Sequence, residues 1–258
     1  MEIEVLVSTM NLKNEKELIK RMNIKTKYTI INQTKNVNEV KSDNVYNYNE
    51  KGLSKSRNRA LSHAIEEICL IADDDVEYLD NYEEIIKSAY KKHKDADIIT
   101  FYIKSLNPDR PVKKVKSKRI NEINAMRIIS SQISFKKQSL INNNITFDED
   151  FGAGSKYDKS EETIMLVDAL KKGLKVININ ETIGTVQQES STWYKGFNQD
   201  FIFKQGASFY RMDKRIYVLL IIQYAIRKYQ YYKQNLTFIE AIANMLRGAK
   251  KYRKDVDK

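Results

Sequence analysis

Three consecutive carboxylates follow an apolar run in the segment CLIADDDVEY, Cys69 to Tyr78. Adjacent like charges repel each other unless a cation, a helix end or water offsets the repulsion. If the apolar residues form a buried strand, the acids lie at the sheet edge where α/β proteins bind ligands. Mg²⁺ and Mn²⁺ take one or two protein carboxylates and complete their shell with phosphate oxygens and water. The triplet therefore indicates a metal–phosphate site, with a solvated turn as the plainer alternative.

Other kinds of metal site fit the sequence poorly. A calcium EF-hand would need a glycine turn and a terminal glutamate after the acids, and neither follows at the right distance. Cys69 is the only cysteine, which excludes an intramolecular disulfide and a cysteine-based zinc site and suits a reducing compartment. The two histidines, His63 and His93, lie far apart in the sequence and make a poor metal pair.

A second segment with ligand-binding chemistry is KGLSKSRNRA, Lys51 to Ala60. It combines a glycine, two serines and two arginines, and it leads into a helical pattern of apolar residues. Helix N-termini and arginine side chains bind phosphate and the polar edges of nucleotides. An ordinary amphipathic helix start is the alternative for this segment.

Strand and helix patterns alternate along the first part of the chain and would position these segments. Strands are expected at EIEVLV, YTIIN, VYNY, CLIA, ADIITFYIK and LKVINI, and helices at residues 14–23, after Ser54, at 80–95 and at 161–171. This alternation predicts an α/β fold with a mostly parallel, doubly wound sheet covered on both faces. The predicted strand ends carry Ser8–Thr9, Asn32–Gln33 and the three aspartates. PVKKVKSKR, Pro111 to Arg119, reads as an exposed loop or edge hairpin.

The order of these motifs resembles the family 2 glycosyltransferases. The segments that carry the resemblance are STM after the first strand, INQ after the second, GLSKSRNRA, a strand ending in DDD, and FGAG followed by SEETIMLVDALKKG. The nearest relatives by these motifs are bacterial enzymes that build surface polysaccharides. The resemblance covers residues 1–195 and implies a GT-A fold with a single Rossmann-like sheet flanked by helices. Residues 196–258 then form a basic, aromatic-rich C-terminal helical region.

The resemblance implies a donor site for a nucleotide-sugar, most simply a UDP-sugar. It assigns the base and ribose to the region of Ser8, Thr9 and Gln33, and the same donor site to Ser54, Arg57 and Asn58. It places Asp73 near the ribose or sugar. It implies that Asp74 or Asp75 ligates an Mn²⁺ or Mg²⁺ ion that bridges the diphosphate.

The resemblance also implies a catalytic base and an acceptor loop. The base is expected from the acidic pair Glu161–Glu162, with Glu162 as the first candidate and Glu161 as the second. Ser160 as an N-cap, with two acids in the first helical turn, is the structural alternative. Gly152 and Gly154 belong to the glycine-rich acceptor loop, and Trp193 either stacks on a sugar face or packs in the core.

Two departures from the family pattern qualify this picture. Many relatives have a histidine after the last strand of this domain, where this chain has Gln187 or Gln188. The metal would then be held by carboxylate and phosphate oxygens, without a histidine ligand. The Gln-x-x-Arg-Trp motif of processive synthases is absent, so we expect an inverting enzyme that adds one sugar per encounter to a saccharide or lipid-linked saccharide.

Two other functions are open on sequence alone. A sugar nucleotidyltransferase would also use an acid cluster and a cation at a strand end. A non-catalytic nucleic-acid-binding protein is suggested by the pI of about 9.4. An acidic strand end would repel nucleic-acid phosphate, so we expect no nucleic-acid partner.

The positive charge is concentrated at the C-terminal end of the chain. From Lys204 onward there are 13 Lys and Arg against 4 Asp and Glu, a net charge of +9 out of +11. Basic amphipathic helices suit anionic membrane surfaces. An apolar stripe is expected at Tyr217, Leu220, Ile221, Tyr224 and Ile226. A helical cap on the sheet is the alternative to a membrane-binding surface, and self-association is a further use of this region.

The longest apolar run, Ile216 to Ile226, is too short for a helix that needs about 20 apolar residues to span a bilayer. The N-terminal residues carry an acid where a signal peptide has positive charge. We therefore expect a cytoplasmic protein that is peripheral on the inner face of the plasma membrane.

Overall fold

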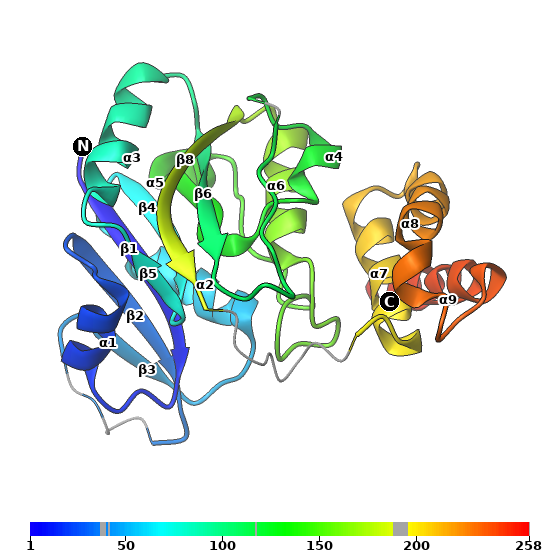
Figure 1. The fold of residues 1–258 in the computed structure, drawn as a ribbon. Coiled ribbons are helices and arrows are strands. Elements are labelled where there is room, and N and C mark those ends of the chain that lie inside the picture. Colours follow the sequence, from blue (N-terminus) through cyan, green and yellow to red (C-terminus); the bar gives the residue numbers. More distant parts are fainter. Residues whose placement is uncertain (37–39, 41, 117, 188–195, 258) are drawn as a thin grey trace.

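A computed structural model describes residues 1–36, 40, 42–116, 118–187 and 196–257. Its centre is one eight-stranded sheet with the order β3-β2-β1-β4-β7-β6-β8-β5 (Figure 1). The strands are β1 (Ile3–Met10), β2 (Lys27–Gln33), β3 (Val45–Tyr48), β4 (Ile68–Asp73), β5 (Val76–Tyr78), β6 (Ile98–Ser105), β7 (Ile133–Lys136) and β8 (Val176–Val186).

The sheet is mixed but mostly parallel, as the sequence predicts. β1 runs parallel to β2 and β4, and β6 runs parallel to β8. Only β7 and β5 run against their neighbours, so six of the eight strands point the same way. Neither reversed strand was predicted, because three or four residues are too few to show a period of two.

Alternating side chains of the inner strands feed two apolar cores, one on each face of the sheet. In β1, Val5 and Val7 enter one core and Leu6 enters the other. The first core also contains residues of α1 (Glu15–Met22) and α3 (Tyr82–Lys92). The helices α2 (Leu53–His63), α4 (Glu122–Ala125), α5 (Lys137–Asn142) and α6 (Glu161–Lys171) contribute to the second, and a short 3-10 helix, η1 (Ser130–Gln132), precedes β7. Both faces are therefore covered, as expected for buried parallel strands.

Three helices complete the chain and form a bundle beside α6 (Figure 1). They are α7 (Gln199–Met212), α8 (Tyr217–Tyr232) and α9 (Phe238–Val256). α7 and α9 cross very closely at Gly206 and Gly248. A Cβ on Gly206 would lie 1.8 Å from the carbonyl oxygen of Met245, and a Cβ on Gly248 would lie 1.8 Å from that of Phe203. Only glycine permits this approach of the two backbones.

The bundle is joined to the sheet domain by ion pairs and aromatic packing. Arg211 on α7 donates to Asp148 at 2.6 Å and to both carboxylate oxygens of Asp168 on α6, at 3.0 and 2.8 Å. Tyr252 on α9 packs edge-on against Phe151, with ring centroids 5.2 Å apart. The predicted helical region after residue 196 thus packs on the sheet domain as a cap.

The expected apolar stripe on α8 is only partly correct. Ile221 and Tyr224 are buried, and Tyr217 and Leu220 pack against the core. Ile226 points outward with 64% of its surface exposed, so it does not belong to the buried face. Among the described residues, no helix is both long and apolar enough to cross a bilayer.

Candidate functional site

The carboxyl ends of β1, β2 and β4 open into a cleft of about 1810 Å³. The parallel register places Ser8 of β1 opposite Asp73 of β4, and Met10 opposite Gln33 of β2. Chain segments far apart in sequence therefore meet at one edge of the sheet. The sequence-predicted site residues that line this cleft are Ser8, Thr9, Gln33, Asp73, Asp74, Asp75, Gly154 and Glu162.

Hydroxyl groups at the end of β1 bond to groups on two neighbouring elements. The Thr9 hydroxyl donates to the Asp74 carboxylate at 2.5 Å. The Ser56 hydroxyl, on the first turn of α2, donates to that of Ser8 at 2.8 Å. These bonds fix the rim of the cleft where β1, β4 and α2 meet.

The side chain of Gln33 holds the start of α2 in place. Its amide nitrogen donates to the carbonyl oxygen of Gly52 at 3.0 Å, and its amide oxygen accepts from the Gly52 N–H at 3.2 Å. Gly52 has a φ of 129°, a backbone conformation that favours glycine. Gln33 therefore positions the GLSKSRN segment while its side chain lines the cleft.

Arg57 on α2 connects two acids of the site. Its guanidinium donates to Asp73 at 3.0 Å and to Glu161 at 2.7 Å, and only 3% of Arg57 is exposed. The Asp73 carboxylate also accepts from the Ser130 hydroxyl at 3.2 Å. Arg57 thus lies beneath the cleft and orients Asp73 and Glu161, rather than lining the surface expected for the donor.

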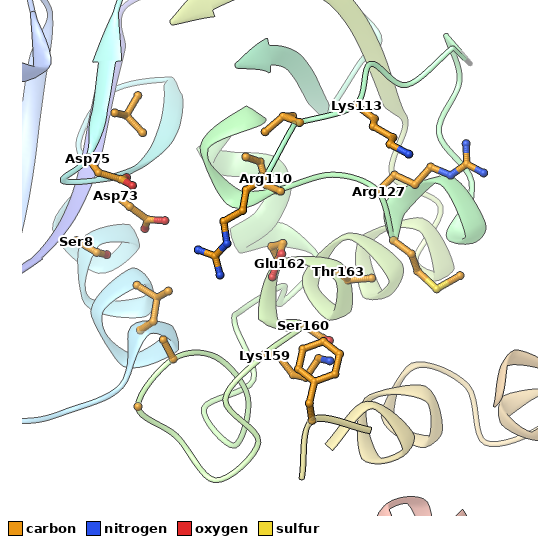
Figure 2. Close-up of a pocket in the computed structure, with 18 of the residues that line it drawn as sticks. Ser8, Asp73, Asp75, Arg110, Lys113, Arg127, Lys159, Ser160, Glu162 and Thr163 are labelled. Carbon is orange, nitrogen blue, oxygen red and sulfur yellow. The ribbon is translucent and has the colours of Figure 1, made fainter. Parts of the chain in front are cut away.

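The two glutamates at the start of α6 differ in their surroundings. Glu161 is 6% exposed and its carboxylate accepts from Arg57. It packs against Gly152, where a Cβ would lie 3.1 Å from Glu161 and 3.0 Å from the Ser54 hydroxyl. Glu162 instead lies in the cleft, where Figure 2 shows it near the centre. The Glu162 carboxylate is therefore the one that can meet a ligand.

The environment of Glu162 favours its neutral form. Burial raises the pKa of Glu162 to about 8, the negative charge of Glu161 adds to the rise, and Arg57 opposes it. A carboxyl group held near neutrality in a cleft is typical of groups that exchange protons with a substrate.

Ser54 and Asn58 do not line the cleft, in contrast to their expected place in the donor site. The Ser54 hydroxyl donates to the carbonyl oxygen of Phe151 at 2.6 Å. The Asn58 amide donates to the carbonyl oxygen of Phe147 at 2.9 Å and accepts from its N–H at 2.8 Å. Both side chains tie α2 to the loop before α6, because that loop offers unpaired backbone groups that they can satisfy.

The donor set fits an Mg²⁺ or Mn²⁺ ion that is shared with a ligand. Asp74 and Asp75 both line the cleft, whereas Asp73 is engaged by Arg57. No cluster of three or more His, Cys, Asp or Glu suited to a metal occurs in the described part of the chain. Two carboxylates without a third protein ligand match an ion whose remaining ligands are phosphate oxygens and water.

The segment after β8 lies close to the acid triplet in the fold. The Gln187 N–H donates to the carbonyl oxygen of Asp75 at 3.3 Å, and Gln187 lines the cleft. Gln187, one of the two glutamines expected in place of the family's histidine, thus lies beside the acid triplet. Gln188 and Trp193 lie outside the described residues.

Ser160 does not cap α6 through its side chain, which corrects the structural alternative for this position. It occupies the N-cap with a φ of 70°, but its hydroxyl makes no cap hydrogen bond. Positive φ is uncommon for serine and often marks functional sites. The side chain of Ser160 lines the cleft next to Glu162.

Sequence reasoning missed a set of cations that share the cleft. They come from the loop after β6, the segment after α4, the segment before α6, and α8, and include Arg110, Lys113, Arg127, Lys159, Arg227 and Lys228. For Arg227 and Lys228 the available signal is the net charge of the last fifth of the chain, which suggests a membrane-facing surface, and for Lys113 it is the basic segment Pro111 to Arg119. The turn of α8 toward the cleft could not be read from the sequence.

Comparisons with known proteins agree with this geometry. Residues 44–163 match the family model described as "Glycosyl transferase family 2". This range includes α2, the acid triplet and the start of α6. The search of curated protein sequences found no match.

Solved structures with a similar fold include TarS of S. aureus. Its crystal structure gives a TM-score of 0.61 at 15% identity, covering 90% of this chain and 44% of that one. The chain thus spans less than half of the TarS chain. TarS 1–349 in complex with UDP gives 0.62 at 15% identity, covering 96% and 81%.

A third similar structure is glucosyl-3-phosphoglycerate synthase from Mycobacterium tuberculosis, in complex with Mn²⁺, UDP-glucose and phosphoglyceric acid. Its TM-score is 0.55 at 10% identity, covering 82% of this chain and 79% of that one. At these identities the likenesses concern the fold, which is that of the GT-A glycosyltransferases.

Proposed function

We propose that this chain is a glycosyltransferase of family 2, whose family model matches residues 44–163, and that it moves one sugar from a UDP-sugar to an acceptor hydroxyl with inversion at the transferred carbon. One observation carries the proposal. The cleft holds the Asp74–Asp75 pair and the Glu162 carboxyl together, while Arg57 engages the neighbouring Asp73 and Glu161. The cleft thus offers one group for a metal–diphosphate and another for a proton.

On the donor side, Asp74 and Asp75 would hold Mn²⁺ or Mg²⁺. The ion supplies positive charge that offsets the negative charge developing on the departing nucleoside diphosphate. Ser8, Thr9 and Gln33 line the same end of the cleft and would contact the base and ribose. UDP is proposed as the nucleotide because similar structures were solved with UDP and with UDP-GlcNAc.

On the acceptor side, Glu162 would take the proton from the attacking hydroxyl. The hydroxyl oxygen forms the new bond to the sugar carbon as the bond to the diphosphate breaks. A single displacement of this kind inverts the configuration at that carbon. Burial beside Glu161 makes the Glu162 carboxylate a stronger base than an exposed glutamate.

The acceptor we propose is a saccharide or a lipid-linked saccharide used in bacterial surface-polysaccharide synthesis. Gly152 packs against Glu161, the chain neighbour of Glu162, and Gly154 lines the cleft. We further propose a cytoplasmic enzyme, peripheral at the membrane, that can self-associate. Flotation with anionic vesicles and light scattering test these last two points.

The experiment that tests the proposal is a screen of UDP-, GDP- and dTDP-sugars with and without Mn²⁺. We expect one UDP-sugar to raise the unfolding temperature only when Mn²⁺ is present, and slow release of UDP from it. Release of pyrophosphate with a sugar phosphate and nucleoside triphosphate would instead identify a nucleotidyltransferase. Stabilisation by no nucleotide-sugar, in either metal condition, contradicts the proposal.

A further inference from the structure

The cleft has two walls of opposite charge. In Figure 2 the acids Asp73 and Asp75 lie at one side, Glu162 lies near the middle, and Lys113 and Arg127 lie at the other. The acidic wall consists of strand ends. The other wall consists of the loop after β6, the residues before α6, and the bundle helices α7 and α8.

Lys159 is the most unusual cation of this second wall. Its ammonium nitrogen is shielded from solvent and has no hydrogen-bond partner in the described part of the chain. It lies 3.1 Å from the ring centroid of Phe201 on α7. Burial lowers the pKa of Lys159 well below its ordinary value, against the attraction of Asp158 and Glu162, and Lys204 and Lys228 lower it further. A buried ammonium without an acceptor is costly unless a ligand supplies one.

Lys228 lies close enough to Lys159 to lower the pKa of Lys159, and Lys113 and Arg227 act in the same way on Lys228. Lys228 on α8 is partly buried, and the charges of Arg227 and Lys113 add to burial in lowering its pKa. Within 4 Å, none of Lys113, Lys159, Arg227 and Lys228 has an acidic partner among the described residues. The acid nearest in sequence, Asp158, is bound by Lys204 at 2.9 Å. Positive charges gathered in this way favour an anion between them.

We propose that this cationic wall, formed by Lys113, Lys159, Arg227 and Lys228, binds a phosphate group of the acceptor. The inference rests on the proposed function and names the class of its second substrate. A phosphate accepts several hydrogen bonds and would pair with the Lys159 ammonium while Lys228 and Arg227 approach from α8. The acceptor hydroxyl would then lie toward Glu162, between the phosphate and the donor.

The position of the wall argues for the acceptor rather than the donor. The donor diphosphate requires the cation held by Asp74 and Asp75, which lie at the strand ends. Lys159 immediately precedes the helix whose first turn carries Glu162, on the side of Phe201 and α7. A flat bilayer is also a poor fit for Lys159, because its ammonium lies inside a cleft and is shielded from solvent.

The test is a ³¹P NMR titration of the full chain with inorganic phosphate and with glucose 1-phosphate, in EDTA so that metal-dependent diphosphate binding is silent. Glucose, which has no phosphorus signal, is added as a neutral competitor. We expect both phosphates to bind and glucose not to displace them. Lys159→Met keeps the side-chain stem, and it should weaken phosphate binding about tenfold or more. Arg227→Gln/Lys228→Gln should do the same while leaving the buried Lys159 in place.

Two control variants separate the outcomes. Lys250→Gln removes an exposed charge on α9 outside the cleft, and Asp74→Ala/Asp75→Ala removes the donor acids; both should bind phosphate normally. Unchanged phosphate binding in Lys159→Met and in the α8 double variant overturns the inference. So does loss of binding to phosphatidylglycerol vesicles, but not to phosphate, in the double variant, which would make the wall a bilayer site.

The proposed function is read out separately in the same proteins. Stabilisation by UDP with Mn²⁺ should be retained in Lys159→Met. Absence of that stabilisation in the wild type would contradict the donor assignment, and the EDTA titration would still report on the cationic wall.

Discussion

Arg57 and Glu161, 104 positions apart in the chain, form a buried ion pair with a nitrogen–oxygen distance of 2.7 Å. The side chains are 2% and 8% exposed. The same guanidinium binds Asp73 at the end of β4. A single arginine therefore sets the relative position of the donor-side acids and the helix that carries Glu162.

Removing this arginine should damage both stability and activity. Arg57→Met leaves Glu161 and Asp73 without their cation, and breaking a buried pair typically costs about 3–5 kcal/mol. Urea unfolding measures the loss. Arg57→Met/Glu161→Gln should recover part of it, since the buried negative charge of Glu161 is then gone. If the double variant is no more stable than Arg57→Met, the unpaired charge of Glu161 is not the cause of the lost stability.

Replacing the proposed base should remove transfer but keep donor binding. Glu162→Gln keeps the side-chain size, and loss of general-base catalysis typically lowers the rate about 10²- to 10⁴-fold. The measurement is kcat for sugar transfer, alongside the thermal shift with UDP and Mn²⁺. Glu161→Gln is the matched control; it should retain transfer, with a rise in rate at lower pH than in the wild type, because the charge of Glu161 contributes to the raised pKa of Glu162. A Glu162→Gln enzyme with wild-type kcat would rule out Glu162 as the catalytic base.

The same carboxyl should make stability depend on pH. Its pKa is raised in the folded state from an ordinary value of 4.5 to about 8 by burial and by Glu161. The folded state therefore holds a proton that the unfolded state releases, and the free energy of unfolding decreases as pH rises from 4.5 to 8. The difference between wild type and Glu162→Gln, followed by urea unfolding across this range, isolates the effect. A difference that is constant with pH would exclude it.

If the acid triplet holds the metal, replacing its carboxylates should abolish the Mn²⁺-dependent binding of UDP. At a ligand concentration of about 100 times Kd, UDP with Mn²⁺ should stabilise the wild type by about 2.7 kcal/mol. Asp74→Asn/Asp75→Asn should lose that stabilisation, and the single variants show which carboxylate contributes more. Glu77→Gln, which also lines the cleft, is the control for charge. If Mn²⁺ and UDP stabilise the double variant as fully as the wild type, Asp74 and Asp75 do not hold the metal.

Where α7 and α9 cross, there is no room for an additional methyl group. Gly206→Ala would place its Cβ against the Met245 carbonyl oxygen, so the helices must separate. We expect a loss of at least about 2 kcal/mol, in the range of overpacked cores. Thermal unfolding measures it against Gln223→Ala, an exposed change on α8. Equal melting temperatures for these two variants would contradict the close crossing.

The sequence alone determined the six strands that run parallel, the four longer helices of the sheet domain, and the edge at which the chemistry lies. Long buried strands such as β1 and β6 were readable because apolar runs of this length have few alternatives. The helix at Glu161–Lys171 was predicted with its observed bounds. The strand-end positions of Ser8, Gln33 and Asp73 followed from the parallel topology, since parallel strands end at one edge.

Only the tertiary structure decided how the polar groups are divided between support and ligand. Ser54, Arg57 and Asn58 belong to one motif, yet they bond to a loop and to acids up to 104 positions away. Such pairings depend on long-range packing, which leaves no local periodicity in the sequence. The same holds for Lys159 and Lys228, whose charges meet because α7 packs against α6 and α8 packs against α7. The number of charged residues can be read from the sequence, but only the fold shows which of them line the side of the cleft opposite the acids.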